Sequence, residues 1–238
     1  MNSHWLYTLI DIGSVLFPLL FSFYPKARFA SKWKYAAPAI VIPALLFIVW
    51  DEFFTRMGVW GFNPRYLTGV MVGHLPIEEI GFFLCIPYAC LFTYEAVGYF
   101  SKYPIDAARA QRPGYVLVAG LLLTGLRHYD KWYTSVTFIA LAAYLLFLLL
   151  VVRPSWLGKF FFAFLFILIP FFLVNGILTG TGIPEEVVWY DNNENLGIRM
   201  GTIPFEDTFY GMLLIVMNVS IFEYLQQRDQ RSVAAIRP

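Results

Sequence analysis

The sequence predicts an all-α polytopic membrane protein with seven transmembrane helices, arranged as two parallel three-helix repeats joined by a linker helix. Of its 238 residues, 59% are hydrophobic and only 14% are charged, whereas soluble domains carry roughly 25% charged residues. The mean hydropathy is +0.62. The apolar residues form long continuous runs, and one acidic motif occurs twice. This composition excludes a soluble globular protein and a disordered chain.

Seven apolar runs account for the expected spans, since a helix needs about 20 apolar residues to cross a membrane. The runs are continuous rather than alternating, which favours helices over the strands of a β-barrel. The first run has no basic segment before it and no small-residue cleavage site after it, so we do not expect a cleaved signal peptide. The runs are 5–22, 36–54, 77–98, 113–126, 133–152, 159–178 and 204–225, of which 113–126 is the shortest.

One acidic motif occurs twice at a fixed spacing. Pro-Ile-Glu-Glu at 76–79 is followed 128 residues later by Pro-Phe-Glu-Asp at 204–207, and each copy opens an apolar run. Upstream of the motifs, Pro43 and Pro170 lie 127 residues apart. The motifs and the prolines recur at nearly the same spacing, which indicates an internal duplication.

The duplication divides the chain into a first three-helix repeat at 1–98, a linker helix within 99–128, and a second three-helix repeat with a tail at 129–238. Three spans and one linker make an even number, so the second repeat enters the membrane from the same side as the first. The repeats are then parallel and related by an axis along the membrane normal. Both acidic motifs should lie at the same membrane face.

Basic residues between the expected spans set the orientation. Segments 23–35, 99–112, 153–159 and 226–238 hold twelve of the 17 lysine and arginine residues, and the connections on the other side hold five. By the positive-inside rule, the N-terminus lies outside and the C-terminus lies in the cytoplasm. We expect an integral protein of a bacterial-type cell membrane.

Several functional classes are excluded by charge and composition. The net charge of +1 offers no basic face for phosphates, so no nucleic-acid partner is expected. Cys85 and Cys90 lie in one apolar run and build no disulfide framework. His4, His74 and His128 are too scattered for a histidine metal cluster. We expect neither a metal nor a cofactor.

Three pairs of acidic residues are expected at one membrane face, just inside the outer interface. Ionisable groups within membrane spans cost about 2.5 kcal/mol or more, and they mark functional sites by default. A proline followed by carboxylates is also an ordinary helix start, favoured by the helix dipole. Two copies at one offset, each doubled to adjacent acids, favour the functional interpretation. The pairs are Asp51 with Glu52, Glu78 with Glu79, and Glu206 with Asp207.

Such pairs suit proton donation to an apolar substrate. Burial and a neighbouring carboxylate both raise the pKa of a carboxyl group, while the dipole at a helix start opposes them. If burial and repulsion dominate, one acid keeps its proton as general acid and another acts as base. Adjacent residues on a helix point about 100° apart, so one acid of each motif can face the bundle interior.

Aromatic and polar neighbours complete the expected site. Aromatic faces stabilise a carbocation through their quadrupole, although a single ring is more often a packing residue. Asn175 is polar within an apolar run, where helix–helix hydrogen bonding is the usual role. The expected supporting residues are Asp51, Glu52, Asn175, Phe82, Phe205, Phe209 and Tyr210.

Two further acids repeat at the same offset. Glu95 and Glu223 lie 128 residues apart, and each is about 26 Å along its helix from the motif. They should reach the cytoplasmic interface, where we expect them to pair with basic residues of the loops.

The apolar spans, the two three-helix units and the doubled motif resemble the lycopene cyclase domain family, in its fused two-repeat form. The resemblance covers nearly the whole chain. It implies an intramolecular isomerase that converts the linear end groups of lycopene, or a related linear carotenoid, to β-ionone rings without net redox change. It also implies that the motif carboxylates Glu78, Glu79, Glu206 and Asp207 are catalytic. The second copy has Asp207 where the first has Glu79, and the resemblance does not assign acid and base.

A proton-coupled membrane transporter of a small or apolar solute remains the alternative, because parallel repeats and buried acids fit it equally well. It predicts water-filled, less aromatic helices, whereas aromatics make up 19% of this chain. A retinal-binding protein requires a Schiff-base lysine in the last span, and 204–225 contains no lysine.

Overall fold

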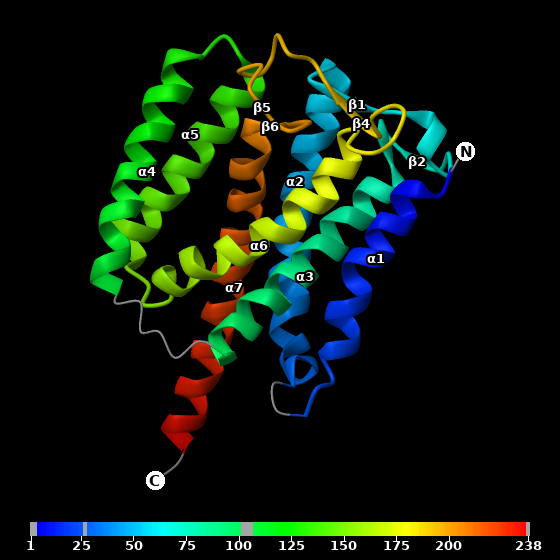
Figure 1. Ribbon diagram of the computed structural model, residues 1–238. Helices are drawn as coiled ribbons and strands as arrows, with labels where there is room; N and C mark the ends of the chain where they lie inside the picture. The colour runs from blue at the N-terminus through cyan, green and yellow to red at the C-terminus, as the bar shows by residue number, and fades with distance from the viewer. Residues whose placement is uncertain (1–3, 26–27, 101–106, 237–238) are drawn as a thin grey trace.

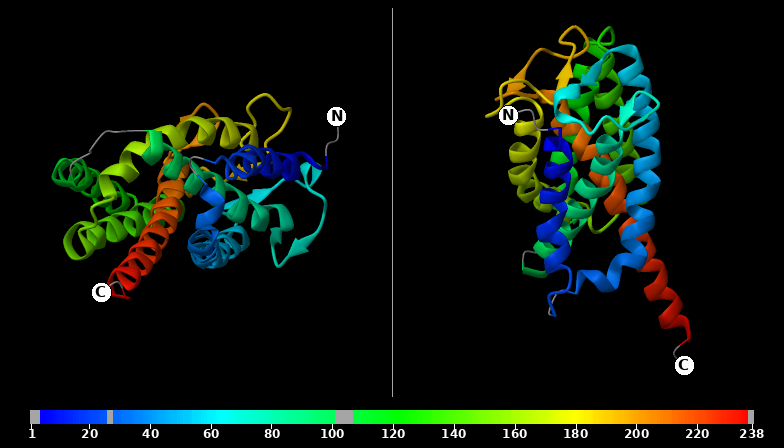
Figure 2. Two further views of the ribbon diagram at one scale, coloured as in Figure 1. Left: turned by 90° about the horizontal axis from the view of Figure 1, so that it is seen from below. Right: turned by 90° about the vertical axis from the view of Figure 1, so that its right-hand side faces the viewer.

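Seven α-helices form one bundle in the computed structural model, which describes residues 4–25, 28–100 and 107–236 (Figure 1). The N-terminal end of α1 and the C-terminal end of α7 lie at opposite ends of the bundle (Figure 2). The helices are α1 (Leu6–Phe21), α2 (Trp33–Met57), α3 (Ile77–Phe100), α4 (Ala107–Arg127), α5 (Trp132–Phe147), α6 (Leu157–Leu178) and α7 (Phe205–Ile236).

Five helical segments of the described residues are long and apolar enough to cross a membrane. α1 is apolar but has only 16 residues. α4 is not among the five, because its first turns carry Arg109, Gln111 and Arg112 ahead of the apolar run. The five segments are Phe29–Met57, Ile77–Phe100, Trp132–Val152, Leu157–Leu178 and Phe205–Ser232.

The outer surfaces of these helices are apolar. On α6, Leu165, Ile169 and Leu173 recur every four residues and are 61%, 71% and 67% exposed. Residues four apart share one face of a helix. An apolar stripe of this kind is costly in water and suits a lipid environment, as the apolar composition predicted.

The helices start and stop where the local sequence requires it. α2 ends at Gly58, whose φ of +77° is the left-handed conformation that glycine adopts without strain. α3 and α7 begin directly after Pro76 and Pro204. Short 3₁₀ turns precede α2 at Phe29–Lys32 and follow β1 at Pro64–Tyr66, and α5 ends in a π-helical turn at Leu148–Val152.

Three short two-stranded ladders, which the all-α prediction did not include, lie at the end of the bundle where α3 and α7 begin (Figure 1). Runs of two or three residues are too short to show an alternating pattern. β2 (Met71–Val72) pairs with β3 (Leu75–Pro76), β5 (Arg199–Met200) pairs with β6 (Ile203–Pro204), and β1 (Trp60–Phe62) pairs with β4 (Val188–Tyr190).

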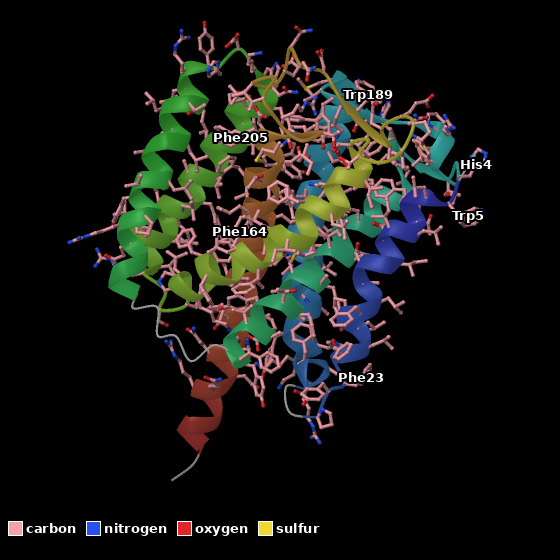
Figure 3. All side chains as sticks on the ribbon, in the orientation of Figure 1. His4, Trp5, Phe23, Phe164, Trp189 and Phe205 are labelled. Atoms are coloured by element: carbon pink, nitrogen blue, oxygen red, sulfur yellow. The ribbon has the colours of Figure 1, made fainter. Side chains whose placement is uncertain are left out.

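The β1–β4 ladder joins the two halves of the chain. It is antiparallel and centred on Gly61 opposite Trp189, residues that are 128 apart like the acidic motifs. A Cβ atom on Gly61 would lie 2.4 Å from Cζ2 of Trp189, so the Trp189 ring occupies the space that a side chain at position 61 would need. Figure 3 shows Trp189 at the same end of the bundle as Trp5, with Phe23 at the other end of α1.

Helix contacts also correspond between the halves. α1 packs on α3 and α5 packs on α7, while α2 packs on α7 and α6 packs on α3. α4 packs mainly against α5. The core between them is fully buried at Phe47, Leu91, Phe160 and Val219.

The far end of the bundle holds the second pair of repeated acids. Glu95 forms ion pairs with Lys32 and with Lys159, whose Nζ lies 3.1 Å from Oε1. Glu223 accepts a hydrogen bond of 2.5 Å from the Tyr94 hydroxyl, and Lys159 lies 3.7 Å from it. Both acids pair with basic residues, as expected, although Lys159 lies in the first turn of α6 and not in a loop.

Candidate active site

A cavity of about 150 Å³ lies between α3, α6 and α7, and Trp60 and Tyr190 of the β1–β4 ladder lie at one end of it. Along α3 its lining extends from Glu79 to Thr93, which is roughly 21 Å at 1.5 Å per residue. The walls are mostly apolar. An elongated apolar cavity that ends in a few polar groups suits a long hydrocarbon.

Three carboxylates from different helices line this cavity: Asp51 of α2, Glu79 of α3 and Asp207 of α7. They are only 1%, 8% and 5% exposed. Asp51 accepts a hydrogen bond from the indole of Trp60, and Glu79 accepts one from the hydroxyl of Tyr7. No lysine or arginine lines the cavity among the described residues.

Asp207 is held by two phenols. Tyr133 donates to Oδ1 at 2.5 Å and Tyr190 donates to Oδ2 at 3.0 Å. Burial, together with the neighbouring Asp207, raises the pKa of Tyr190 well above its usual value. Tyr190 therefore stays protonated near neutral pH and remains a hydrogen-bond donor.

The first acid of each motif binds a loop. Glu206 is fully buried and accepts hydrogen bonds from the backbone N–H of Leu196 at 2.8 Å and the hydroxyl of Thr134 at 2.6 Å. Glu78 accepts from the backbone N–H of Thr68 at 2.7 Å. Both acids thus bind a backbone N–H ten residues before them, which fixes the loop that leads into α7 or α3.

Aromatic rings enclose the acidic end of the cavity. The Trp60 ring lies 5.0 Å from that of Tyr133, 6.1 Å from that of Tyr190 and 5.9 Å from that of Tyr210. The rings of Tyr133 and Tyr190 are stacked at 5.8 Å. Four electron-rich rings around buried carboxylates form a surface that attracts positive charge.

The structure brings together part of the set predicted from the sequence. Glu79, Asp207, Asp51, Phe82, Asn175 and Tyr210 all line the cavity. Glu78 and Glu206 are buried behind it, at the loops.

Three other members of that set lie elsewhere. Glu52 does not line the cavity and instead pairs with His74 at 2.6 Å, because it points away from its neighbour Asp51 on the same helix. The rings of Phe205 and Phe209 pack against Phe138 of α5, at 6.4 and 4.9 Å.

The sequence analysis missed Tyr7, Tyr133 and Tyr190, which donate to the cavity carboxylates. A signal for the first two was present. Tyr7-Thr8 recurs as Tyr133-Thr134, 126 residues later, and in both copies the tyrosine binds the second motif acid while the threonine contacts the first. Within the described residues, no group of three His, Cys, Asp or Glu side chains is placed to hold a metal ion.

Comparison with known proteins identifies the family. The protein-family model described as lycopene cyclase matches residues 4–97 and 130–225, which together make up most of the chain. The chain belongs to the lycopene cyclase family. The two matched blocks leave α4 between them, and each block contains one copy of the acidic motif.

One curated relative is itself named for this chemistry. This lycopene cyclase family member is 31% identical over 93 residues to a bifunctional lycopene cyclase/phytoene synthase of Aspergillus niger. The match covers 39% of this chain and 15% of the fungal protein. No solved structure matches the chain.

Proposed function

We propose that the chain is a membrane-bound lycopene β-cyclase, an isomerase that closes the linear end groups of lycopene or a related linear carotenoid into β-ionone rings. The observation that carries this proposal is that Glu79 and Asp207, from the two copies of the motif, are both buried and line one elongated cavity with aromatic walls. The family membership supports the substrate class. Ring closure is an isomerisation without net oxidation or reduction, so it requires no redox partner.

The chemistry follows from the arrangement of acids and rings. A carboxylic acid protonates the terminal double bond of the end group and leaves a tertiary cation. The next double bond attacks that cation, which closes a six-membered ring and moves the charge onto the ring. A carboxylate then removes a ring proton, and its C–H electron pair becomes the new double bond. The rings of Trp60, Tyr133, Tyr190 and Tyr210 lie where they stabilise the intermediate charge.

The motif acids divide the work in this proposal. Glu79 and Asp207 face the cavity and exchange protons with the substrate. Glu78 and Glu206 contribute by fixing the loops that carry the site. Asp51, Phe82, Asn175 and Tyr210 shape the cavity, while Glu52, Phe205 and Phe209 support it from outside.

The same proposal includes the arrangement of the chain in the membrane. It has two parallel three-helix repeats, 1–98 and 129–238, a linker helix in 99–128, and seven spans in total. The matched pairs Tyr7–Glu79 and Tyr133–Asp207 support it. So does the antiparallel ladder centred on Gly61 and Trp189, because equivalent strands pair in this way about a two-fold axis. A lipid-embedded site also suits a substrate that is insoluble in water.

Expression of the full chain in a lycopene-producing bacterial strain tests the proposal. Membranes should change from red to yellow, and ring-bearing carotenoid should appear in extracts resolved by liquid chromatography. Confirmed membrane expression with unchanged lycopene would reject the cyclase. Proton-dependent uptake of a solute into vesicles by that same preparation would favour the transporter alternative.

Reporter fusions test the proposed orientation, with the N-terminus outside and the C-terminus in the cytoplasm. Alkaline phosphatase, which is active only outside the cytoplasm, should be active when fused after Tyr129, in the connection between α4 and α5. It should be inactive when fused after Pro154, in the connection before α6. The opposite pattern would invert the orientation, and equal activity at both sites would remove α5 from the list of spans.

A further inference from the structure

The two carboxylates that face the cavity are bonded differently. Both oxygens of Asp207 accept hydrogen bonds from phenols, Oδ1 from Tyr133 and Oδ2 from Tyr190. Glu79 accepts from Tyr7 through Oε2, and no described residue donates to Oε1. A carboxylate that accepts at both oxygens is satisfied as an anion, whereas a carboxylic acid needs one oxygen free to carry its own proton.

The charged groups near Glu79 also differ from those near Asp207, and they favour a proton on Glu79. Two further buried acids, Asp51 and Asp11, interact electrostatically with Glu79. One oxygen of each has no hydrogen-bond partner among the described residues. Asp207 has one buried acid beside it, Glu206, whose Oε1 already accepts two hydrogen bonds. It also has a cation nearby, because the guanidinium of Arg199 lies 5.4 Å from the ring centre of Tyr190, which itself binds Asp207.

These surroundings favour different protonation states for the two groups. Buried like charges cannot all ionise, so the cluster of Glu79, Asp51 and Asp11 retains a proton. Asp207 has two donors and a nearby cation, which favour its ionised form. The two repeats therefore share a backbone arrangement, but their equivalent acids differ in protonation state.

We infer that Glu79 is the proton donor of ring closure, with Asp51 sharing its proton, and that Asp207 is the base that removes the ring proton. This inference rests on the proposed cyclase function. The proton on Glu79 Oε1 forms the new C–H bond at the inner carbon of the terminal double bond, which leaves the tertiary cation on the outer carbon. The ring closes, and Asp207 takes a proton from the carbon next to the ring cation. Glu79 ends the cycle ionised and Asp207 ends it protonated, so nothing is oxidised and the proton then returns to Glu79.

Placement of the base decides which ring isomer forms, because different neighbouring C–H bonds give different double-bond positions. The two carboxylates therefore leave different signatures when they are disturbed. A weakened donor slows every product equally. A displaced or weakened base allows protons to leave from other carbons, so the proportion of isomeric rings rises.

Three conservative substitutions separate these signatures in the full chain, expressed in lycopene-producing cells and assayed in isolated membranes. Tyr190→Phe removes one donor from Asp207, and Tyr7→Phe removes the donor from Glu79. Tyr94→Phe is the matched control, because this buried tyrosine also donates to a carboxylate, Glu223, but lies outside the cavity. All three variants keep the aromatic ring.

Tyr190→Phe should lower the ratio of β rings to isomeric rings about tenfold, the effect of one lost hydrogen bond to a charged group. Tyr7→Phe should slow ring formation about tenfold at an unchanged ratio. Tyr94→Phe should change neither quantity. A shift of the ratio in Tyr7→Phe alone would reverse the assignment, and the same response in both variants would overturn it.

If Tyr190→Phe does not accumulate in membranes, a second variant tests the same inference. Tyr133→Phe removes the other donor from Asp207 and should shift the product ratio in the same direction. An unchanged ratio in that variant would overturn the inference. Failure of the cyclase proposal is a separate result, since the unsubstituted chain would then form no ring at all.

Discussion

Replacing Glu79 by glutamine is expected to lower the rate of ring formation by about 10²- to 10⁴-fold, the usual contribution of a general acid. Glutamine has the same shape and its amide oxygen can still accept the hydrogen bond from Tyr7, so the helix contact between α1 and α3 survives. What is lost is a proton that the group can release. Ring formation is measured in membranes that contain equal amounts of each variant.

Glu223→Gln is the matched control for this experiment. Glu223 also accepts a hydrogen bond from a tyrosine of the bundle, Tyr94, but at the other end of the molecule. The control should retain ring formation close to that of the unsubstituted chain. Equal loss in both variants would show that the loss does not depend on a carboxylate in the cavity, and full activity of Glu79→Gln would remove Glu79 from the chemistry.

Much of the architecture could be predicted from the sequence because lipid imposes a simple rule. Apolar runs must satisfy their backbone groups as helices, so six of the expected spans fall on α1, α2, α3, α5, α6 and α7. Most of their ends agree to within a few residues, but α7 continues to Ile236, well beyond the apolar run that ends at 225. The run at 113–126 falls within the longer helix α4, whose polar first turns hid its start.

The division of labour within each motif could not be predicted from the sequence. Glu78 and Glu79 lie about 100° apart on the helix, but α3 is apolar on all sides, so no amphipathic pattern indicates which acid faces inwards. Tyr7 and Tyr133 also look like ordinary interfacial aromatics when taken singly. Only the repeated Tyr-Thr pair, 126 residues apart, distinguishes them.

The contacts between side chains that are distant in the sequence could not be predicted either. Asp51 and Glu52 are neighbours of the same chemical type, yet one lines the cavity and the other pairs with His74 at the surface. The difference depends on the turn of α2 and on the position of Trp60, which binds Asp51. Positions of this kind follow from packing between elements and not from local sequence.

Truncation of Glu206 to alanine is expected to destabilise the fold more than any other single change at the two motifs. Glu206 is fully buried and satisfies both the backbone N–H of Leu196 and the hydroxyl of Thr134. Each buried donor left without a partner costs about 1–3 kcal/mol, and the vacated space adds a cavity term. The free energy of unfolding, measured in detergent with a denaturant series, should fall by the sum of these costs.

Two comparisons separate this role from catalysis. Glu206→Gln keeps an amide oxygen that can accept both hydrogen bonds, so its stability should remain close to that of the unsubstituted chain. Glu78→Ala should cost less than Glu206→Ala, because Thr8 lies 3.5 Å from Glu78 whereas Thr134 lies 2.6 Å from Glu206. If Glu206→Ala unfolds like the unsubstituted chain but forms no rings, Glu206 acts on the substrate rather than on the loop. If it loses stability while Glu206→Gln does not, the first acid of the motif holds the site in place and leaves proton transfer to the second.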